Sequence, residues 1–304
     1  KSLLPDPYYL MDMEVACKKT LESILNDKNI VIFADYDVDG ATSSAIIRRY
    51  LNDIGVKSGL YIPDRLEEGY GPTEGAMEFL AKENNLCIML DCGSTSFGPL
   101  KVAAQNDLSV IILDHHTTTQ TIPECTALVN PNRFDQNLGE REDLKFLCTA
   151  GVAYLFIIAL NRILRENNFF KGVAEPDLRQ HLDLVALGTV CDVMPIKGIN
   201  RAFVSQGLKV TNMLQNEGIK ALNDVASLKS KLNAYHFGFI LGPRINAGGR
   251  VGCADFGSKL LSSNCEKEAK DLAIKLNEYN QERQQIEKEV LAHAYFIIDE
   301  QKLY

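Results

Sequence analysis

The sequence lacks several features that would each point to a particular class of protein. Its eight cysteines include no pair at CxxC spacing, so a zinc knuckle is not expected. Most of these cysteines lie in apolar stretches, which favours reduced, buried thiols in a cytoplasmic protein. The longest apolar run, AGVAYLFIIAL at 150–160, is too short to span a bilayer and predicts a buried helix. No signal-peptide pattern, low-complexity segment or repeat of fixed period is visible.

Basic residues are fewer than acidic ones. The 304 residues include 32 lysines and arginines against 40 aspartates and glutamates, a formal net charge of -8. This balance argues against a surface that coats nucleic acid everywhere, but it leaves room for a local basic groove. With 46% hydrophobic residues the composition is that of a globular protein with two domains or subdomains. Because the sequence begins at Lys1 rather than at a methionine, we expect a fragment of a longer chain.

The first half of the chain alternates between apolar strands and helical patterns. Strands are expected at 30–35, 58–63, 86–91 and 108–114, and the segments between them have helical spacing. The strands are almost wholly apolar, which is typical of a parallel sheet covered by helices on both faces. The sequence therefore predicts an α/β fold with a domain at 1–145.

The second half is predicted to be mainly helical. Helices are expected at 149–166 and at 175–190, where Pro176 would lie in the first turn. The stretch 265–294 has no glycine or proline and carries Glu/Lys pairs at helical spacing, which predicts one long exposed helix. YFIID at 295–299 then predicts the start of a strand.

These patterns give the expected division of the second half. We assign 146–264 to a mainly helical continuation of the core and 265–304 to a long connector helix. The connector would lead to a C-terminal domain that lies outside this sequence.

Three of the apolar strands end in an aspartate. In an open parallel sheet, ligands bind beyond the carboxyl ends of the strands. The first of these ends continues as DYDVDG, whose aspartates at alternate positions point the same way in extended chain, and a helix start follows that attracts anions. The residues expected to converge at this edge are Asp35, Asp37, Asp39, Asp91, Asp114, His115 and His116.

Such a cluster predicts a metal site. Several carboxylates cannot share a small site in ionised form unless cations neutralise them. Carboxylate and imidazole together suit Mn²⁺ or Mg²⁺, and two such ions are a common device for hydrolysing phosphoesters. A strand-terminal aspartate is more often a simple cap, but three at one edge favour the metal site. A calcium loop of the EF-hand kind is disfavoured, because position twelve counted from Asp35 is Ile46 rather than glutamate.

The ordered motifs DYDVDG, DCG, LDHH and GTVCDVMPI resemble those of the DHH phosphoesterase superfamily, which is named after its Asp-His-His triplet. IPDRLEEGYGP, LVNPNR and GPRINAGGR resemble more specifically its RecJ-type exonucleases, and the similarity runs through essentially the whole chain. The resemblance implies a metal-dependent exonuclease that degrades single-stranded DNA from the 5′ end, in repair and recombination. It also implies two Mn²⁺ or Mg²⁺ ions, and a single-strand-binding protein and a helicase as partners. No pattern indicates an oligomer, so a monomer is expected.

The resemblance assigns roles to individual residues. The implied metal ligands are Asp35, Asp37, Asp39, Asp91, His115 and Asp192. His116 would lie beside the scissile phosphate as a catalytic group, and Asp114 would orient a histidine from behind. Arg244, Asn246 and Arg250 of a Gly/Ala-rich loop would contact the DNA strand, because arginine forks suit phosphate oxygens. Apart from the resemblance, Tyr70 is a candidate for stacking on a base and equally a candidate for holding its own loop.

Two alternatives stay open. DHH enzymes of the pyrophosphatase type and many that act on small substrates carry a histidine four residues before the DxD motif, where this chain has Phe33. A phosphodiesterase for short oligonucleotides or cyclic dinucleotides is therefore the second hypothesis. The third is a DHH-fold scaffold without catalysis, which the retained aspartates disfavour.

Overall fold

The computed structural model describes residues 4–65, 68–69 and 71–301. Five parallel strands form one sheet in the order β2-β1-β3-β4-β5. Their bounds are β1 Ile30–Ala34, β2 Ser58–Tyr61, β3 Leu86–Leu90, β4 Ser109–Leu113 and β5 Ala127–Val129. Four of these are the predicted strands. The fifth, only three residues long, was not predicted, because so short a run has no periodicity to reveal it.

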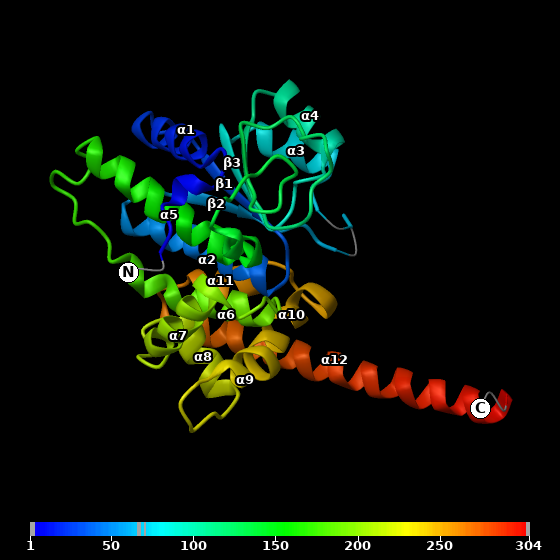
Figure 1. The fold of residues 1–304 in the computed structure, drawn as a ribbon. Helices are drawn as coiled ribbons and strands as arrows, with labels where there is room; N and C mark the ends of the chain where they lie inside the picture. Colours follow the sequence, from blue (N-terminus) through cyan, green and yellow to red (C-terminus); the bar gives the residue numbers. More distant parts are fainter. Residues whose placement is uncertain (1–3, 66–67, 70, 302–304) are drawn as a thin grey trace.

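Helices cover both faces of the sheet, as predicted from the apolar strands (Figure 1). The bounds are α1 Met13–Leu25, α2 Val38–Asp53, α3 Glu74–Ala81, α4 Phe97–Gln105 and α5 Thr149–Glu166. Alternate residues of β1 point to opposite faces: Ile32 packs in the core with α1, α2 and α5, whereas Phe33 packs with α3 and α4. Phe33 is fully buried and stacks on Tyr61 at 5.5 Å between ring centroids.

The second half is helical and continues the larger of the two cores. Its bounds are α6 Leu182–Cys191, α7 Gly198–Thr211, α8 Glu217–Val225, α9 Ala234–His236, α10 Gly242–Val251, α11 Phe256–Ser262 and α12 Glu266–Gln301. α6 packs on α7, α2 and α5, and α11 packs on α2. These contacts place the end of α6 beside the carboxyl edge of the sheet. Three 3-10 turns, Pro7–Tyr9, Glu142–Phe146 and Leu178–His181, and a π-helical turn, Phe237–Leu241, complete the described elements.

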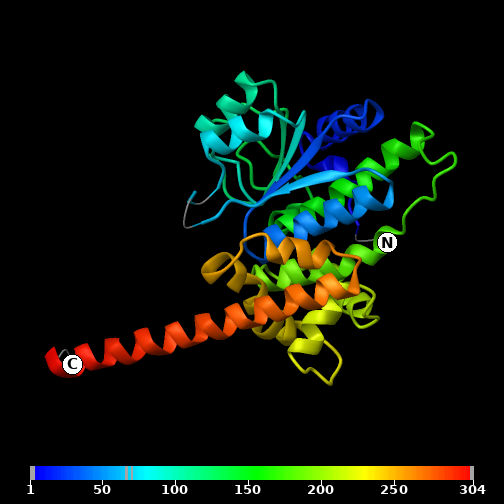
Figure 2. The same ribbon diagram turned by 180° about the vertical axis from the view of Figure 1, so that it is seen from behind.

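α12 differs from the prediction at its end. Its first half packs on α8, α10 and α11, and the rest projects away from the body in both views (Figures 1 and 2). The strand predicted at 295–299 was wrong, since the helix continues to Gln301. β-branched and aromatic residues favour strands only weakly, and no breaker separates them from the preceding helix.

The predicted helix at 175–190 was wrong at its start. The segment begins as the 3-10 turn Leu178–His181, and α6 starts at Leu182. Pro176 therefore precedes the helix instead of lying in its first turn. Within the described part of the chain, none of the helices combines the length and the apolarity that a membrane span needs. The eight cysteines are free thiols, and Cys253 and Cys265 are exposed.

Candidate metal centre

The carboxyl ends of β1, β3 and β4 meet at one edge, and an aspartate follows each strand. The main-chain amide of Asp35 donates to the Leu90 carbonyl over 3.2 Å, and that of Asp91 to the Leu113 carbonyl over 3.1 Å. Asp114 makes the same contact to Val129. Each aspartate thus continues the ladder of its neighbour by one bond. This regular extension brings their side chains to the same edge, as the sequence predicted.

The start of α2 adds two further carboxylates. Asp37 is the N-cap of this helix, and its Oδ1 accepts from the amides of Asp39 at 2.8 Å and Gly40 at 3.0 Å. The turn is tight, because a Cβ atom at Gly40 would lie 2.1 Å from the Asp35 carbonyl oxygen. Only glycine lets Asp35, Asp37 and Asp39 come together in this way.

Asp39 is held from the opposite side by α5. Its Oδ2 accepts from the Thr149 amide at 2.6 Å, and its Oδ1 accepts from the Ala150 amide at 2.9 Å. The N-cap residue of α5, Cys148, offers no side-chain cap. The buried Asp39 carboxylate therefore supplies the cap from a distant part of the chain. The Thr149 hydroxyl also donates to Asp91 Oδ1 at 2.9 Å, so one residue touches two carboxylates of the cluster.

His115 lies in the middle of the aspartates. Its Nε2 is 3.5 Å from Asp91 Oδ1, 3.5 Å from Asp192 Oδ2 and 3.9 Å from Asp39 Oδ2. Asp192 stands directly after the last residue of α6, and its Oδ2 is buried without a hydrogen-bond partner. A buried oxygen left in this way is costly unless something else binds it, and a cation is a fitting partner.

Asp114 binds the other histidine. Its Oδ1 lies 2.7 Å from His116 Nδ1 and also accepts from the amides of His115 and His116. Burial alone would raise the pKa of Asp114, but the bonds and charge of His116 outweigh it and lower the pKa to about 2. The same contact raises the pKa of the half-exposed His116 to about 9. Asp114 is thus placed to orient His116 rather than to meet the other carboxylates.

Four of the other carboxylates, those of Asp35, Asp39, Asp91 and Asp192, resist ionisation. Burial, followed by the charge of Asp37, raises the pKa of Asp35 and that of Asp39 to about 6. Burial and the charge of Asp39 raise the pKa of Asp192 to about 7, and the same causes raise the pKa of Asp91 well above its ordinary value. Burial lowers the pKa of His115, which favours its neutral, metal-binding form. Such a cluster becomes stable in ionised form when cations join it.

Three overlapping groups within the described residues have ligand atoms within 4.8 Å of one another. They are Asp35, Asp37 and Asp91; Asp39, His115 and Asp192; and Asp91, His115 and His116. The first two groups share no residue, and the third links them through Asp91 and His115. This arrangement can hold two neighbouring cations, and all the expected metal ligands take part.

The segment GPRINAGGR was expected to be a loop, and this prediction was wrong. It forms α10, preceded by a π-helical turn at Phe237–Leu241. Asn246 Oδ1 accepts from the Val38 amide at 3.0 Å and so touches the start of α2. Arg244 donates to Asn277 of α12 and to the Ile240 carbonyl, and Arg250 is exposed. Asn246 therefore borders the cluster, while Arg244 is engaged with α12; Tyr70 lies outside the described residues.

Sequence reasoning missed three residues that support the cluster. Asn130 donates to Ser94 Oγ and to the His116 carbonyl, each over 2.9 Å, and Asn132 donates to the His115 carbonyl over 2.7 Å. The third is Thr149. The only signal for the asparagines was their place in the motif LVNPNR, whereas Thr149 lies in an apolar helix and gives no signal.

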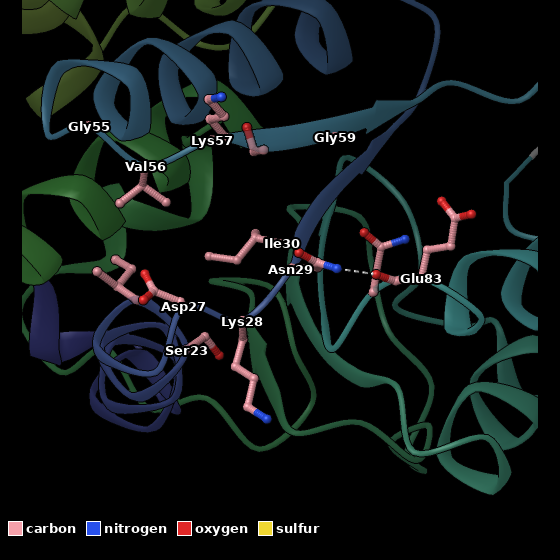
Figure 3. A pocket seen from close by; sticks show the side chains of 13 residues that line it. Ser23, Asp27, Lys28, Asn29, Ile30, Gly55, Val56, Lys57, Gly59 and Glu83 are labelled. Carbon is pink, nitrogen blue, oxygen red and sulfur yellow. Dashed lines mark hydrogen bonds between the residues drawn. The ribbon is translucent and has the colours of Figure 1, made fainter.

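A surface cavity of about 610 Å³ lies at the other end of the strands (Figure 3). It is lined by the first residues of β1 and β2 and by charges of both signs, including Asp27, Lys28, Lys57 and Glu83. Asn29 bonds the Glu83 carbonyl at its edge. Because it opens at the amino ends of the strands, it is separate from the cluster of aspartates.

Comparison with known proteins identifies relatives of this chain. The chain is 36% identical over 285 residues to the single-stranded-DNA-specific exonuclease RecJ of Dickeya dadantii, and the match covers 92% of this chain and 49% of the relative. It is 34% identical to the Thermus thermophilus exonuclease of the same name, over 89% of this chain and 38% of the relative. The chain thus spans about half the length, or less, of these curated relatives.

Solved structures of exonucleases with the same name also resemble this chain. A crystal structure of exonuclease RecJ bound to manganese superposes with a TM-score of 0.82 at 33% identity, over 96% of this chain and 70% of that one. RecJ from Thermus thermophilus in complex with Mn²⁺ gives a TM-score of 0.79 at 30% identity, over 96% of this chain and 40% of that one. Residues 29–189 match the family model described as "DHH family, N-terminal domain". With its five-stranded parallel sheet, its Asp-His-His triplet and this match, the chain belongs to the DHH family.

Proposed function

We propose that the protein is the catalytic part of a metal-dependent exonuclease that degrades single-stranded DNA from the 5′ end. The observation that carries this proposal is the pair of ligand groups at the carboxyl edge, which share no residue and are bridged by Asp91 and His115. The names of the relatives and the metal ions in their structures support it. A role in repair and recombination follows from the same likeness.

The donor set fits two Mn²⁺ or Mg²⁺ ions. Asp35, Asp37 and Asp91 would hold one, and Asp39, His115 and Asp192 the other. Bound there, the ions supply a water of lowered pKa and neutralise charge that develops on the phosphate. The unpartnered Oδ2 of Asp192 supports this fit, because a buried oxygen without a hydrogen-bond partner is costly unless a cation binds it.

The protein's own residues would complete the chemistry. Asp114 fixes His116 through Nδ1, which leaves the Nε2 side of the ring for a ligand. From there His116 would donate a hydrogen bond, or a proton, to a phosphate oxygen. Asn130 and Asn132 hold the main-chain carbonyls of the histidine pair and so keep both rings in place.

The strand of DNA would enter along α10. Asn246 of α10 contacts the start of α2, and Arg250 is exposed in the last turn of α10. We propose Arg244, Asn246 and Arg250 as contacts to the DNA backbone. For Arg244 this requires the side chain to leave its bond with Asn277.

Release of nucleotides from single-stranded DNA tests the proposal. A 5′-phosphorylated oligonucleotide labelled at either end is incubated with Mn²⁺ or with EDTA, and the Asp37→Ala protein runs beside it. Mononucleotide release from the 5′ end that needs Mn²⁺ and is lost in the variant is the expected result.

Two other outcomes would contradict the proposal. Hydrolysis of dinucleotides without release from the longer strand would favour a small-substrate phosphodiesterase. Failure on both substrates by the full-length chain, with Mn²⁺ bound, would favour a scaffold.

A further inference from the structure

A segment beside the metal centre differs in charge from the rest of the protein. The whole chain has a net charge of -8, yet residues 225–254 contain no aspartate or glutamate. They carry Lys229, Lys231, Arg244 and Arg250. The segment includes α9, the π-helical turn Phe237–Leu241 and α10. We call it the acid-free segment.

Two aromatic side chains stand exposed on this segment. Tyr235 is 61% exposed and Phe239 is 72% exposed. Their rings stack on each other, with centroids 5.1 Å apart and an angle of 26° between the planes. A spacing of four residues places them on one face of the helix, so they present a continuous apolar surface to solvent.

The helical stretch that carries the aromatic pair contacts α6 and the start of α2, two elements that supply metal ligands. The π-helical turn packs on the end of α6, where Cys191 Sγ donates to the Phe237 carbonyl at 3.3 Å and Gly238 faces Val190. The residue after Cys191 is the ligand Asp192. The helical stretch then runs on to Asn246 at the start of α2. At a rise of 1.5 Å per residue, Tyr235 and Asn246 are about 16 Å apart along this helical stretch.

We propose that Tyr235 and Phe239 form a stacking platform for bases of a single-stranded DNA that is held at the metal centre. The proposal rests on the function proposed above. Aromatic faces bind unpaired bases of any sequence, and the positive charges of the acid-free segment attract the phosphates between them. The segment carries four lysines and arginines, so charge attraction and stacking would act together on the strand.

The platform also gives a physical basis for strand selectivity. Bases of a duplex are already stacked and paired, and they would have to be unstacked before they could reach Tyr235 or Phe239. A single strand exposes the same faces without that cost. The platform therefore favours single strands without contacts to base edges, which are the groups that specify sequence.

A single introduced fluorophore tests the platform directly. The chain has no tryptophan, so Phe239→Trp places one reporter on the platform. A His116→Ala background prevents cutting, and Mn²⁺ is kept in the buffer. Oligothymidylate is added while tryptophan emission and the anisotropy of a labelled oligomer are recorded. Phe79→Trp is the matched control, because Phe79 is 60% exposed but lies on α3, which covers the other face of the sheet.

Affinity measurements give a second readout. Tyr235→Ala with Phe239→Ala should weaken binding of the oligomer about 10- to 100-fold, and leave the slope of log affinity against log salt unchanged, because stacking releases no counterions. Lys229→Ala with Lys231→Ala should flatten that slope instead. Phe79→Ala should change neither quantity.

The outcomes distinguish failure of the stacking platform from failure of the proposed nuclease function. Quenching in the Phe239→Trp protein, absent in the Phe79→Trp protein and weak with duplex DNA, is the expected result. Binding seen by anisotropy without quenching, with full affinity in the double alanine variant, would overturn the platform and leave the nuclease proposal intact. Equal quenching by duplex DNA would also overturn it. No binding by anisotropy in any protein would overturn both and would favour a protein partner for this surface.

Discussion

The hydroxyl of Thr149 donates to Asp91 Oδ1 over 2.9 Å, and both residues are fully or almost fully buried. The main-chain amide of the same threonine donates to Asp39. Thr149 therefore sets the position of Asp91 relative to Asp39, two carboxylates that belong to different ligand groups.

Replacing Thr149 by valine keeps the shape of the side chain and removes the hydroxyl. We expect Mn²⁺ to bind about 10- to 100-fold more weakly, because groups that orient metal ligands typically have effects of this size. Titration calorimetry without DNA measures the affinity. Thr149→Ser keeps the hydroxyl and should retain most of it. Unchanged affinity in the valine variant would show that Asp91 is fixed by other contacts.

Divalent cations should stabilise the fold more at high pH than at low pH. In the folded protein without cations, the pKa values of Asp35, Asp39 and Asp192 are raised from 3.8 to about 6, 6 and 7. Raised values mean that the carboxyls contribute stability below pH 3.8 and lose it as the pH rises through 6 to 7.

Thermal unfolding at pH 5.5 and pH 8, in EDTA and in Mn²⁺, measures this effect. At about 100 times the dissociation constant, cation binding contributes about 2.7 kcal/mol. We expect a larger rise in Tm from Mn²⁺ at pH 8, where the carboxylates are ionised. An equal rise at both values would mean that these carboxyls do not titrate as described. Asp39→Asn should reduce the rise, since it alters a ligand.

Gly40 should not tolerate even one added methyl group. A Cβ atom there would meet the Asp35 carbonyl oxygen at 2.1 Å, so Gly40→Ala must shift the chain between Asp35 and Asp39. A misplacement of about 1 Å in a catalytic group costs about 10²-fold in rate, and we expect a loss of that order in nuclease activity.

Gly75→Ala is the matched control, because a Cβ atom at Gly75 meets nothing within 4 Å. In helix α3 the change should stabilise by about 0.5–1 kcal/mol and leave activity unaltered. Activity of Gly40→Ala equal to that of the control would show that the turn can relax.

The buried Asp183 should make the protein less stable as the pH rises from 3.8 to 7. Burial raises its pKa to about 7, so the folded protein holds a proton that the unfolded chain has lost in this range. Asp183→Asn removes this loss and should stabilise the protein at pH 8 by about 2–4 kcal/mol.

The buried His181 acts with the opposite sign. Burial lowers its pKa to about 3, so stability from His181 rises with pH between 3 and 6.5. Denaturant unfolding of the native protein and the Asp183→Asn variant across pH separates the two. A difference between them that stays constant from pH 4 to pH 8 would argue against a titrating Asp183.

The carboxylates of the sheet edge could be predicted from the sequence, because each follows an apolar strand and the ends of parallel strands coincide. Asp192 could not be placed by pattern alone, and only the likeness of GTVCDVMPI pointed to it. Thr149 could not be found at all, since its role depends on a distant helix start meeting Asp39.

GPRINAGGR shows how local signals can mislead. Its proline and three glycines suggested a loop, yet it is a helix. Gly249 packs so closely that a Cβ atom would lie 2.1 Å from the Tyr36 ring. Gly249 therefore reflects close approach between helix α10 and the residues before α2, which a propensity scale does not register.

By capping α5, Asp39 connects the metal centre to a helix of the hydrophobic core. The amide hydrogens of Thr149 and Ala150 point at this carboxylate, and both residues are fully buried at the start of a core helix. Those hydrogens can exchange with solvent only when their hydrogen bonds to Asp39 break or the first turn of α5 unfolds. Hydrogen exchange at these two amides therefore reports on the metal centre: when a cation holds Asp39 in place, the first turn of α5 should exchange more slowly.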